Sequence, residues 1–386
     1  MKPVYLDNLA GTPLHPQVKE VMIGHINEVY GNPSSQHQIG DAASTALAEA
    51  RGKVAALLHA KPEEIVFCSG GTESVNHAIK GVAWARRDKG RHIITSNIEH
   101  KSVLSSLRAL KMMGWDLTSL DVDKHGLLDP KAVEKAIRED TVLISIMHAN
   151  NEIGTMEPIA EIGRIARERK IPFHSDAVAS AGVMPIDVQA LNVDLLSIAA
   201  NQFYGPAGVG ALYVRRGTPL WPLLDGGPQE NNKRAGTANL IGIVGMGKAA
   251  ELALKEMDQR LAQLKALRQR LIVGLRAKIS HIIINGHPDK CLPHLVSASV
   301  SFIEGESMML LLDEEGICVS TRSACASGSL RASHVLLAIG LDFADAQGTM
   351  VLTLGRENTE ADVDLLLEKL PPIVERLRAM SPIYKG

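Results

Sequence analysis

Short apolar runs alternate with helix-length amphipathic segments from residue 60 to about residue 216. The runs are rich in β-branched residues and are bounded by turn residues, which is typical of buried strands. The segments between them, such as 101–114 and 159–170, carry apolar residues at helical spacing. This alternation predicts an α/β fold with a mostly parallel sheet between helices, whose ligands gather at the carboxyl ends of the strands. The seven expected strands are residues 63–69, 91–96, 115–122, 141–148, 171–176, 193–199 and 208–214.

The pattern changes after residues 226–240, "GGPQENNKRAGTANL". A long helical stretch from about 238 to 279 leads out of the sheet, and shorter strands and helices follow it. We therefore expect a large α/β domain over residues 16–255 and a small α+β domain formed by residues 1–15 and 256–386. The strands expected in the small domain are 294–302, 317–321 and 349–355, with helices at 306–316 and 360–380.

Charge and composition exclude several classes of function. Lys and Arg number 41 against 43 Asp and Glu, so no basic field is available for a nucleic-acid backbone. The first residues carry no basic and apolar leader, and no run approaches the roughly 20 apolar residues that a membrane span needs. We expect a soluble, cytoplasmic protein with neither a nucleic-acid nor a membrane partner.

The four cysteines are too few and too scattered for a disulfide framework or a zinc site, so no metal is expected. Most of them should be inert core thiols. Cys325 is the candidate exception.

Polar residues follow several of the expected strands. "FCSGGTES" (67–74) leads from a strand through Gly71 and Thr72 into a helix, which predicts an anion-binding cup or, more commonly, a tight turn with a threonine cap. His100 follows the next strand and could lie on an aromatic ring, although histidines there are more often caps or solvated. Asn151 and Asp176 follow two further strands. An aspartate at such a place can hold a pyridinium nitrogen protonated, and a helix N-cap is about as frequent.

Together these residues belong to an ordered series of motifs that resembles the cysteine desulfurases. The series runs "YLDNLAGTP", "GNPSS", "SGGTES", "IEH", "SIMHANNEIG", "HSDA", "YGPAGVGALYVRR", "RAGT", "NGHP", "IEGES", "STRSACASGSLRASHVLLAIGL" and "LTLGRENTEADVD", and it covers almost the whole chain. The family comprises homodimeric pyridoxal 5′-phosphate (PLP) enzymes of the class V aminotransferase group, with the fold type I architecture. They convert L-cysteine into L-alanine and leave the sulfur as a persulfide on an enzyme cysteine.

The resemblance implies a role for each motif residue at the cofactor. Gly71 and Thr72 would hold the cofactor phosphate, with Thr237 reaching in from the other subunit of the homodimer. His100 would stack on the pyridine ring and help to move protons. Asp176 would bind the ring nitrogen.

The substrate and sulfur sites follow in the same way. Asn151 would bind the phenolic oxygen of the cofactor or the substrate. Arg356 would grip the substrate carboxylate as a bidentate fork, with Asn32 beside it. Cys325 would be the nucleophile that takes the sulfur, and it is also a candidate iron–sulfur cluster ligand. The Gly- and Ser-containing stretch after it resembles the branch of the family that passes sulfur to an iron–sulfur scaffold protein.

One motif departs from the family at the position that matters most. The family has Ser-x-His-Lys before "YGPKG", and its lysine binds PLP as a Schiff base and moves the Cα proton; here Ala199, Asn201 and Gln202 occupy those positions. Ala199 offers the phosphate no donor and Asn201 only an amide, while Ala179 replaces a family glutamine that contacts the phenolic oxygen. An amide forms no imine and is no base near neutral pH, so both tasks of the lysine are vacant at Gln202.

Three interpretations follow. In the first, PLP condenses with cysteine in solution, the adduct binds without a covalent link to the chain, His100 or another base moves the proton, and Cys325 slowly takes the sulfur. Lys101 is a conceivable substitute amine, but neighbouring residues on a helix point about 100° apart. In the second, the dimer is a catalytically inactive or sulfide-using scaffold and sulfur relay that holds an iron–sulfur scaffold protein, and Cys325 accepts persulfide or ligates a nascent cluster. The third, another PLP reaction such as transamination, is disfavoured because it needs the lysine and not Cys325.

Overall fold

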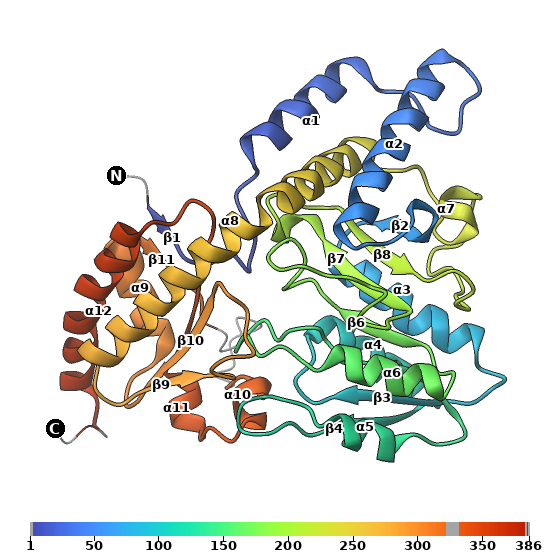
Figure 1. Ribbon diagram of the computed structural model, residues 1–386. Coiled ribbons are helices and arrows are strands. Elements are labelled where there is room, and N and C mark those ends of the chain that lie inside the picture. Colours follow the sequence, from blue (N-terminus) through green and yellow to red (C-terminus); the bar gives the residue numbers. More distant parts are fainter. Residues whose placement is uncertain (1–2, 322–331, 383, 385–386) are drawn as a thin grey trace.

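The central sheet has the seven strands that the sequence predicts. The computed structural model describes residues 3–321, 332–382 and 384 (Figure 1). The strand order is β2-β8-β7-β6-β5-β3-β4, in which β8 runs antiparallel to both of its neighbours and the other pairs are parallel. The strands are β2 (Ile65–Cys68), β3 (His92–Ser96), β4 (Asp116–Leu120), β5 (Thr141–Ser145), β6 (Phe173–Asp176), β7 (Leu195–Ala199) and β8 (Gly210–Val214).

Helices pack on both faces because alternate strand residues point to opposite sides. In β2, Val66 joins a core with α3 (Gly71–Ala85) and α4 (Lys101–Met112), whereas Ile65 and Phe67 join a second core. The helices of that second core include α1 (Pro16–Glu28), α2 (Gln38–Leu57), α5 (Pro130–Ala136), α6 (Ile159–Glu168) and the first half of α8 (Leu240–Lys278).

Helix α8 links the sheet to the second half of the chain, and Figure 1 shows it running from beside α2 to beside α12 (Glu360–Met380). A three-stranded antiparallel sheet lies there, in the order β12-β10-β9. Its strands are β9 (Ile282–Asn285), β10 (Leu295–Val300) and β12 (Thr349–Thr353). Helices α9 (Gly305–Glu314), α10 (His334–Ala338) and α11 (Phe343–Gln347) complete this half. The domain boundary at residues 255 and 256 stays a prediction, because α8 runs through it without a break.

The N-terminal segment belongs to both halves of the fold. Its strand β1 (Val4–Tyr5) pairs in parallel with β11 (Ile317–Cys318). The Thr353 N–H of β12 donates to the carbonyl of Leu6 at 2.7 Å, and the Thr12 N–H donates to the carbonyl of Asn201 at 2.8 Å. Residues 6–12 therefore reach from the small sheet to the turn after β7.

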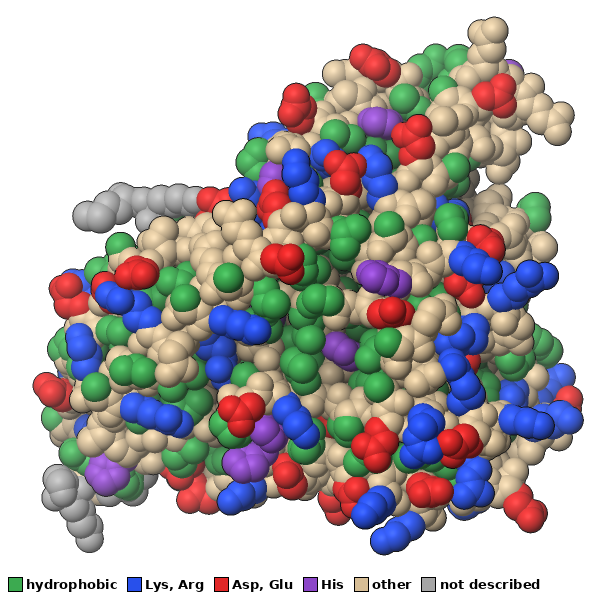
Figure 2. All heavy atoms as spheres, viewed as in Figure 1, with side chains coloured by type: hydrophobic (Ala, Val, Ile, Leu, Met, Phe, Trp, Pro, Cys, Tyr) green, Lys and Arg blue, Asp and Glu red, His purple; other side chains and the backbone are tan. Residues whose placement is uncertain are grey.

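The surface carries no dominant charge on the side drawn in Figure 2, where acidic and basic side chains are interspersed. Among the described residues, none of the helices combines the length and the apolar character that a membrane crossing requires.

Candidate functional site

A cavity of about 340 Å³ lies where the carboxyl ends of several strands meet. It brings together seven of the residues that the sequence singles out, namely Gly71, Thr72, His100, Asn151, Asp176, Asn201 and Gln202. Ala179 and Ala199, the two small residues at family polar positions, also line it. The other lining residues are Leu9, Ala10, Ser102, Met147, Ala149 and Val178.

Asp176 ends β6 and is the buried acid of the cavity. Its Oδ1 accepts a hydrogen bond from the Val178 N–H at 3.0 Å, so the turn-forming role expected of an aspartate here is also present. Burial raises the pKa of the Asp176 carboxyl, and the nearby His100 opposes that rise. A cationic ligand would relieve the cost of burying this carboxylate, and the site therefore suits a protonated ring nitrogen.

His100 is the N-cap of α4, as the simpler interpretation of its position predicts. Its Nδ1 accepts a hydrogen bond from the Ser102 N–H at 3.2 Å and lies 2.8 Å from the Ser102 hydroxyl. Because Nδ1 accepts, the neutral ring carries its proton on Nε2. His100 therefore combines the capping role with a place on the cavity wall, where its ring presents an N–H donor.

The N-terminus of α3 forms another part of the wall. Gly70 precedes it with φ 152°, a conformation that favours glycine, and a Cβ at Gly71 would lie 2.7 Å from the Cγ2 of Val178. A side chain at position 71 would therefore crowd Val178 on the cavity wall. The free N–H groups and positive end of this helix of 15 residues suit a phosphate.

Gln202 ends the short 3₁₀ turn η2 (Ala200–Gln202) that links β7 to β8, and it is 8% exposed. Its Nε2 donates to the carbonyl of Leu9 at 3.0 Å, and its Oε1 has no hydrogen-bond partner among the described residues. None of the described lining residues is a lysine, and Lys101 points to solvent at the start of α4. The described lining residues therefore suit a pyridine ring and a phosphate, and none of them offers an amine for covalent attachment.

Three sequence-predicted residues lie outside this cavity, and their roles stay predictions. Arg356 has a buried Nη1 without a hydrogen-bond partner among the described residues, and its Nε lies 3.5 Å from Glu357. Asn32 is exposed and accepts a hydrogen bond from the Ser34 N–H at 2.9 Å. Thr237 lines a separate cavity of about 80 Å³. The family resemblance implies that it contacts the cofactor phosphate bound by the other subunit. Cys325 lies outside the described residues.

Two features of this region escape sequence reasoning. Leu9 contributes a backbone carbonyl, which no side-chain pattern can indicate, although it lies within the quoted motif "YLDNLAGTP". Glu99 precedes His100 and is fully buried, and burial raises the pKa of its carboxyl to about 8. Its place in the quoted motif "IEH" was the available signal.

Comparison with known protein families supports the sequence resemblance. Residues 4–366 match the family model described as aminotransferase class-V. A cysteine desulfurase IscS of Dictyoglomus turgidum is 52% identical over 382 residues, which cover 99% of this chain and 97% of that protein. A cysteine desulfurase IscS of Methanosarcina thermophila is also 52% identical over 382 residues, covering 99% of this chain and 94% of the relative.

Solved structures agree with this match. A NifS-like protein superposes with a TM-score of 0.91 at 40% identity, covering 97% of this chain and all 100% of that chain. A structure titled "SspA in complex with cysteine" has a TM-score of 0.81 at 38% identity, covering 91% of this chain and 98% of that chain. The predicted fold type is thereby confirmed.

Proposed function

Because this chain belongs to the aminotransferase class-V family and its relatives include cysteine desulfurases, we propose that it mobilises sulfur from L-cysteine using non-covalently held PLP. The family assignment implies the cofactor, while the mode of binding is inferred from the cavity. One observation carries the proposal: the residues suited to a ring nitrogen, a ring face and a phosphate line the same cavity, and none of its described lining residues is a lysine.

Different described residues would bind different parts of the cofactor. Asp176 would pair with the protonated ring nitrogen, His100 would pack against the ring, and the start of α3 at Gly71 and Thr72 would hold the phosphate. Asn151 would bind the phenolic oxygen or the substrate. Bound PLP supplies an electron sink next to the α-carbon of an amino acid.

The atoms and electrons of the overall sulfur transfer balance when one cysteine of the chain accepts the sulfur. The C–S bond of L-cysteine breaks, an S–S bond forms between its sulfur and that of Cys325, and a proton replaces sulfur on the β-carbon, giving L-alanine and a Cys325 persulfide. Arg356, with Asn32, would bind the substrate carboxylate. The acceptor of the persulfide sulfur would be an iron–sulfur scaffold protein, and a homodimer would bring Thr237 to the partner's cofactor phosphate.

Proton transfer limits this reaction. The ring of His100, with Nδ1 already accepting from Ser102, is poised as a donor at Nε2 rather than as a base. Gln202 removes no proton. The absence of a general base typically costs on the order of 10²–10⁴-fold in rate, so turnover should be slow.

The same geometry favours a second candidate function. With the base missing at Gln202, the protein could serve as a scaffold and sulfur relay in which the Cys325 thiol takes the outer sulfur of a persulfide made elsewhere and the donor is released as a thiol. The assay that separates the two measures alanine and sulfide after addition of PLP and L-cysteine. Alanine formed by the native chain and not by Cys325→Ser supports desulfuration. No alanine, with a scaffold protein still bound, supports the relay.

A further inference from the structure

Gln202 lines the cavity and carries a hydrogen-bond acceptor that the described residues leave unsatisfied. Its Oε1 is buried and has no partner among the described residues, whereas its Nε2 is occupied by the carbonyl of Leu9 at 3.0 Å. Burying an acceptor without a partner costs free energy, so a ligand that brings a donor to Oε1 gains affinity.

The orientation of this amide is fixed by its neighbour. Exchanging Oε1 and Nε2 would place one oxygen against another, because the Leu9 carbonyl can only accept. Leu9 itself is held by its own N–H, which donates to the Thr353 hydroxyl of β12 at 3.1 Å. The unsatisfied group of Gln202 is therefore an acceptor and not a donor.

Other groups on the wall do not satisfy Oε1. Asn151, Asn201 and Thr72 line the cavity and carry donors, yet none of them forms a hydrogen bond with Gln202 in the described chain. A lysine at this position would have presented a donor and a nucleophile; the glutamine presents neither. The replacement thus reverses the hydrogen-bonding character of this wall.

We propose that Gln202 Oε1 accepts a hydrogen bond from an amino group of the bound ligand, so that the cavity prefers an amine to an aldehyde. Pyridoxamine 5′-phosphate should then bind more tightly than PLP, whose aldehyde oxygen is itself an acceptor. The inference rests on the proposed function for the class of cofactor. It concerns a ligand preference that the chain's own glutamine creates.

The test is isothermal titration of the full-length protein with pyridoxamine 5′-phosphate and with PLP, without substrate. The native chain should bind the amine about tenfold or more tightly than the aldehyde, as one hydrogen bond to a charged group would give. Gln202→Leu should lose this preference, and Gln202→Glu should retain it, because a protonated carboxyl donates its O–H to the Leu9 carbonyl and keeps the other oxygen as an acceptor. Gln259→Leu, at an exposed position on α8, should change neither affinity.

The outcomes are distinguishable. Equal affinities in the native chain, or an amine preference that survives in Gln202→Leu, would overturn the role of Gln202 and leave the proposed function standing. Failure of both compounds to bind the native chain would overturn the cofactor assignment and the inference with it. A melting curve checks that Gln202→Leu is folded, and Gln202→Glu tests the same claim independently.

Discussion

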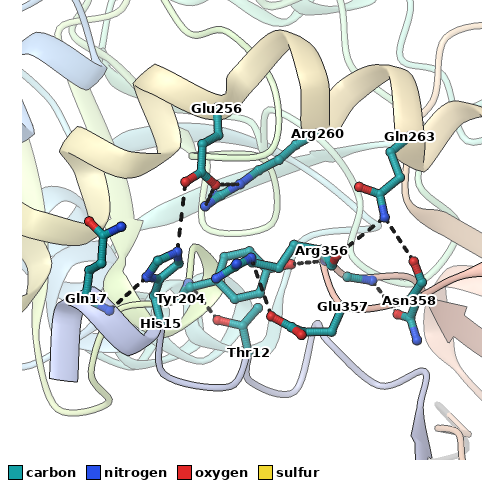
Figure 3. Close-up of polar contacts among 11 residues, drawn as sticks. Thr12, His15, Gln17, Tyr204, Glu256, Arg260, Gln263, Arg356, Glu357 and Asn358 are labelled. Carbon is teal, nitrogen blue, oxygen red and sulfur yellow. Dashed lines mark hydrogen bonds and ion pairs between the residues drawn. The ribbon is translucent and has the colours of Figure 1, made fainter. Parts of the chain in front are cut away.

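The backbone N–H of Arg356 donates a hydrogen bond of 2.7 Å to the hydroxyl of Tyr204, and its guanidinium lies 6.0 Å from the same ring (Figure 3). The guanidinium of Arg260 lies 4.9 Å from that ring as well. Tyr204 follows Gln202 by two residues, and its N–H donates to the Thr12 hydroxyl at 2.7 Å. One tyrosine thus connects the turn at the lysine position to the arginine expected to bind substrate.

Tyr204→Phe should therefore weaken both stability and carboxylate binding. It keeps the ring but removes the acceptor for the Arg356 N–H, which should cost about 1 kcal/mol in the free energy of unfolding. The affinity for L-cysteine should fall several-fold while that for PLP is unchanged. Tyr30→Phe is the control, since Tyr30 is 76% exposed. Unchanged unfolding and cysteine affinity in Tyr204→Phe would contradict this role.

Glu99 should make stability decrease as pH rises. Its Oε1 accepts from the Ser96 hydroxyl at 2.7 Å and from the Met147 N–H at 2.9 Å, and burial raises its pKa from 4.5 to about 8. The folded chain keeps this proton up to about pH 8 while the unfolded chain releases it near pH 4.5, so stability is lost between these values.

The isosteric Glu99→Gln should remove that loss. The free energy of unfolding of Glu99→Gln minus that of the native chain should rise by a few kcal/mol from pH 5 to pH 8.5. Urea unfolding at both pH values measures this difference. Glu63→Gln, at an exposed position, should show no such gain. A stability difference between Glu99→Gln and the native chain that does not vary with pH would contradict the prediction.

The ion pair of Arg51 with Glu230 should contribute far more to the free energy of unfolding than the ion pair that Lys53, on the same helix, forms with Glu251. Arg51 Nη2 lies 2.6 Å from a Glu230 carboxylate that is 7% exposed, and this carboxylate also accepts from the Phe67 N–H at 2.8 Å. Arg51→Ala leaves a buried charge unpaired and should lower the free energy of unfolding by about 3 kcal/mol.

The control is Lys53→Ala, which removes a pair with Glu251 whose side chains are 41% and 37% exposed. An exposed pair of this kind contributes about 1 kcal/mol or less. Chemical denaturation of both variants gives the comparison. Equal losses for Arg51→Ala and Lys53→Ala would show that burial does not govern these pairs.

Gly71→Ala should weaken phosphate binding by crowding the cavity wall. The new Cβ would lie 2.7 Å from the Cγ2 of Val178, so the double variant with Val178→Ala should recover the affinity for PLP. Gly52→Ala, where no atom lies within 4 Å of the new Cβ, should leave binding unchanged. Failure of Val178→Ala to rescue would contradict the steric explanation.

The fold could be predicted from the sequence wherever the hydrophobic pattern determines the secondary structure. The strands of the large sheet lie within short, mostly apolar runs bounded by turn residues, and their directions place Asp176, His100 and Gly71 at one edge. β9 was missed, since its four residues follow α8 after only a short turn.

The contacts that define the chemistry were less predictable. Gln202 finds its partner 193 residues away in a backbone carbonyl, and Leu9 carries no side-chain sign of that role. The link between Tyr204 and Arg356 likewise joins residues 152 apart. Such pairs depend on how the two halves of the fold meet, which local patterns do not encode.

The claim that the chain holds PLP without a covalent bond is tested most directly by intact-mass measurement. The purified protein is incubated with equimolar PLP, freed of unbound cofactor, treated with borohydride and denatured. The account predicts that the native chain keeps its unmodified mass, although an absorbance band shows bound cofactor before denaturation, while Gln202→Lys gains the mass of one reduced PLP. A native chain that carries one covalent PLP on a lysine within the cavity would contradict it.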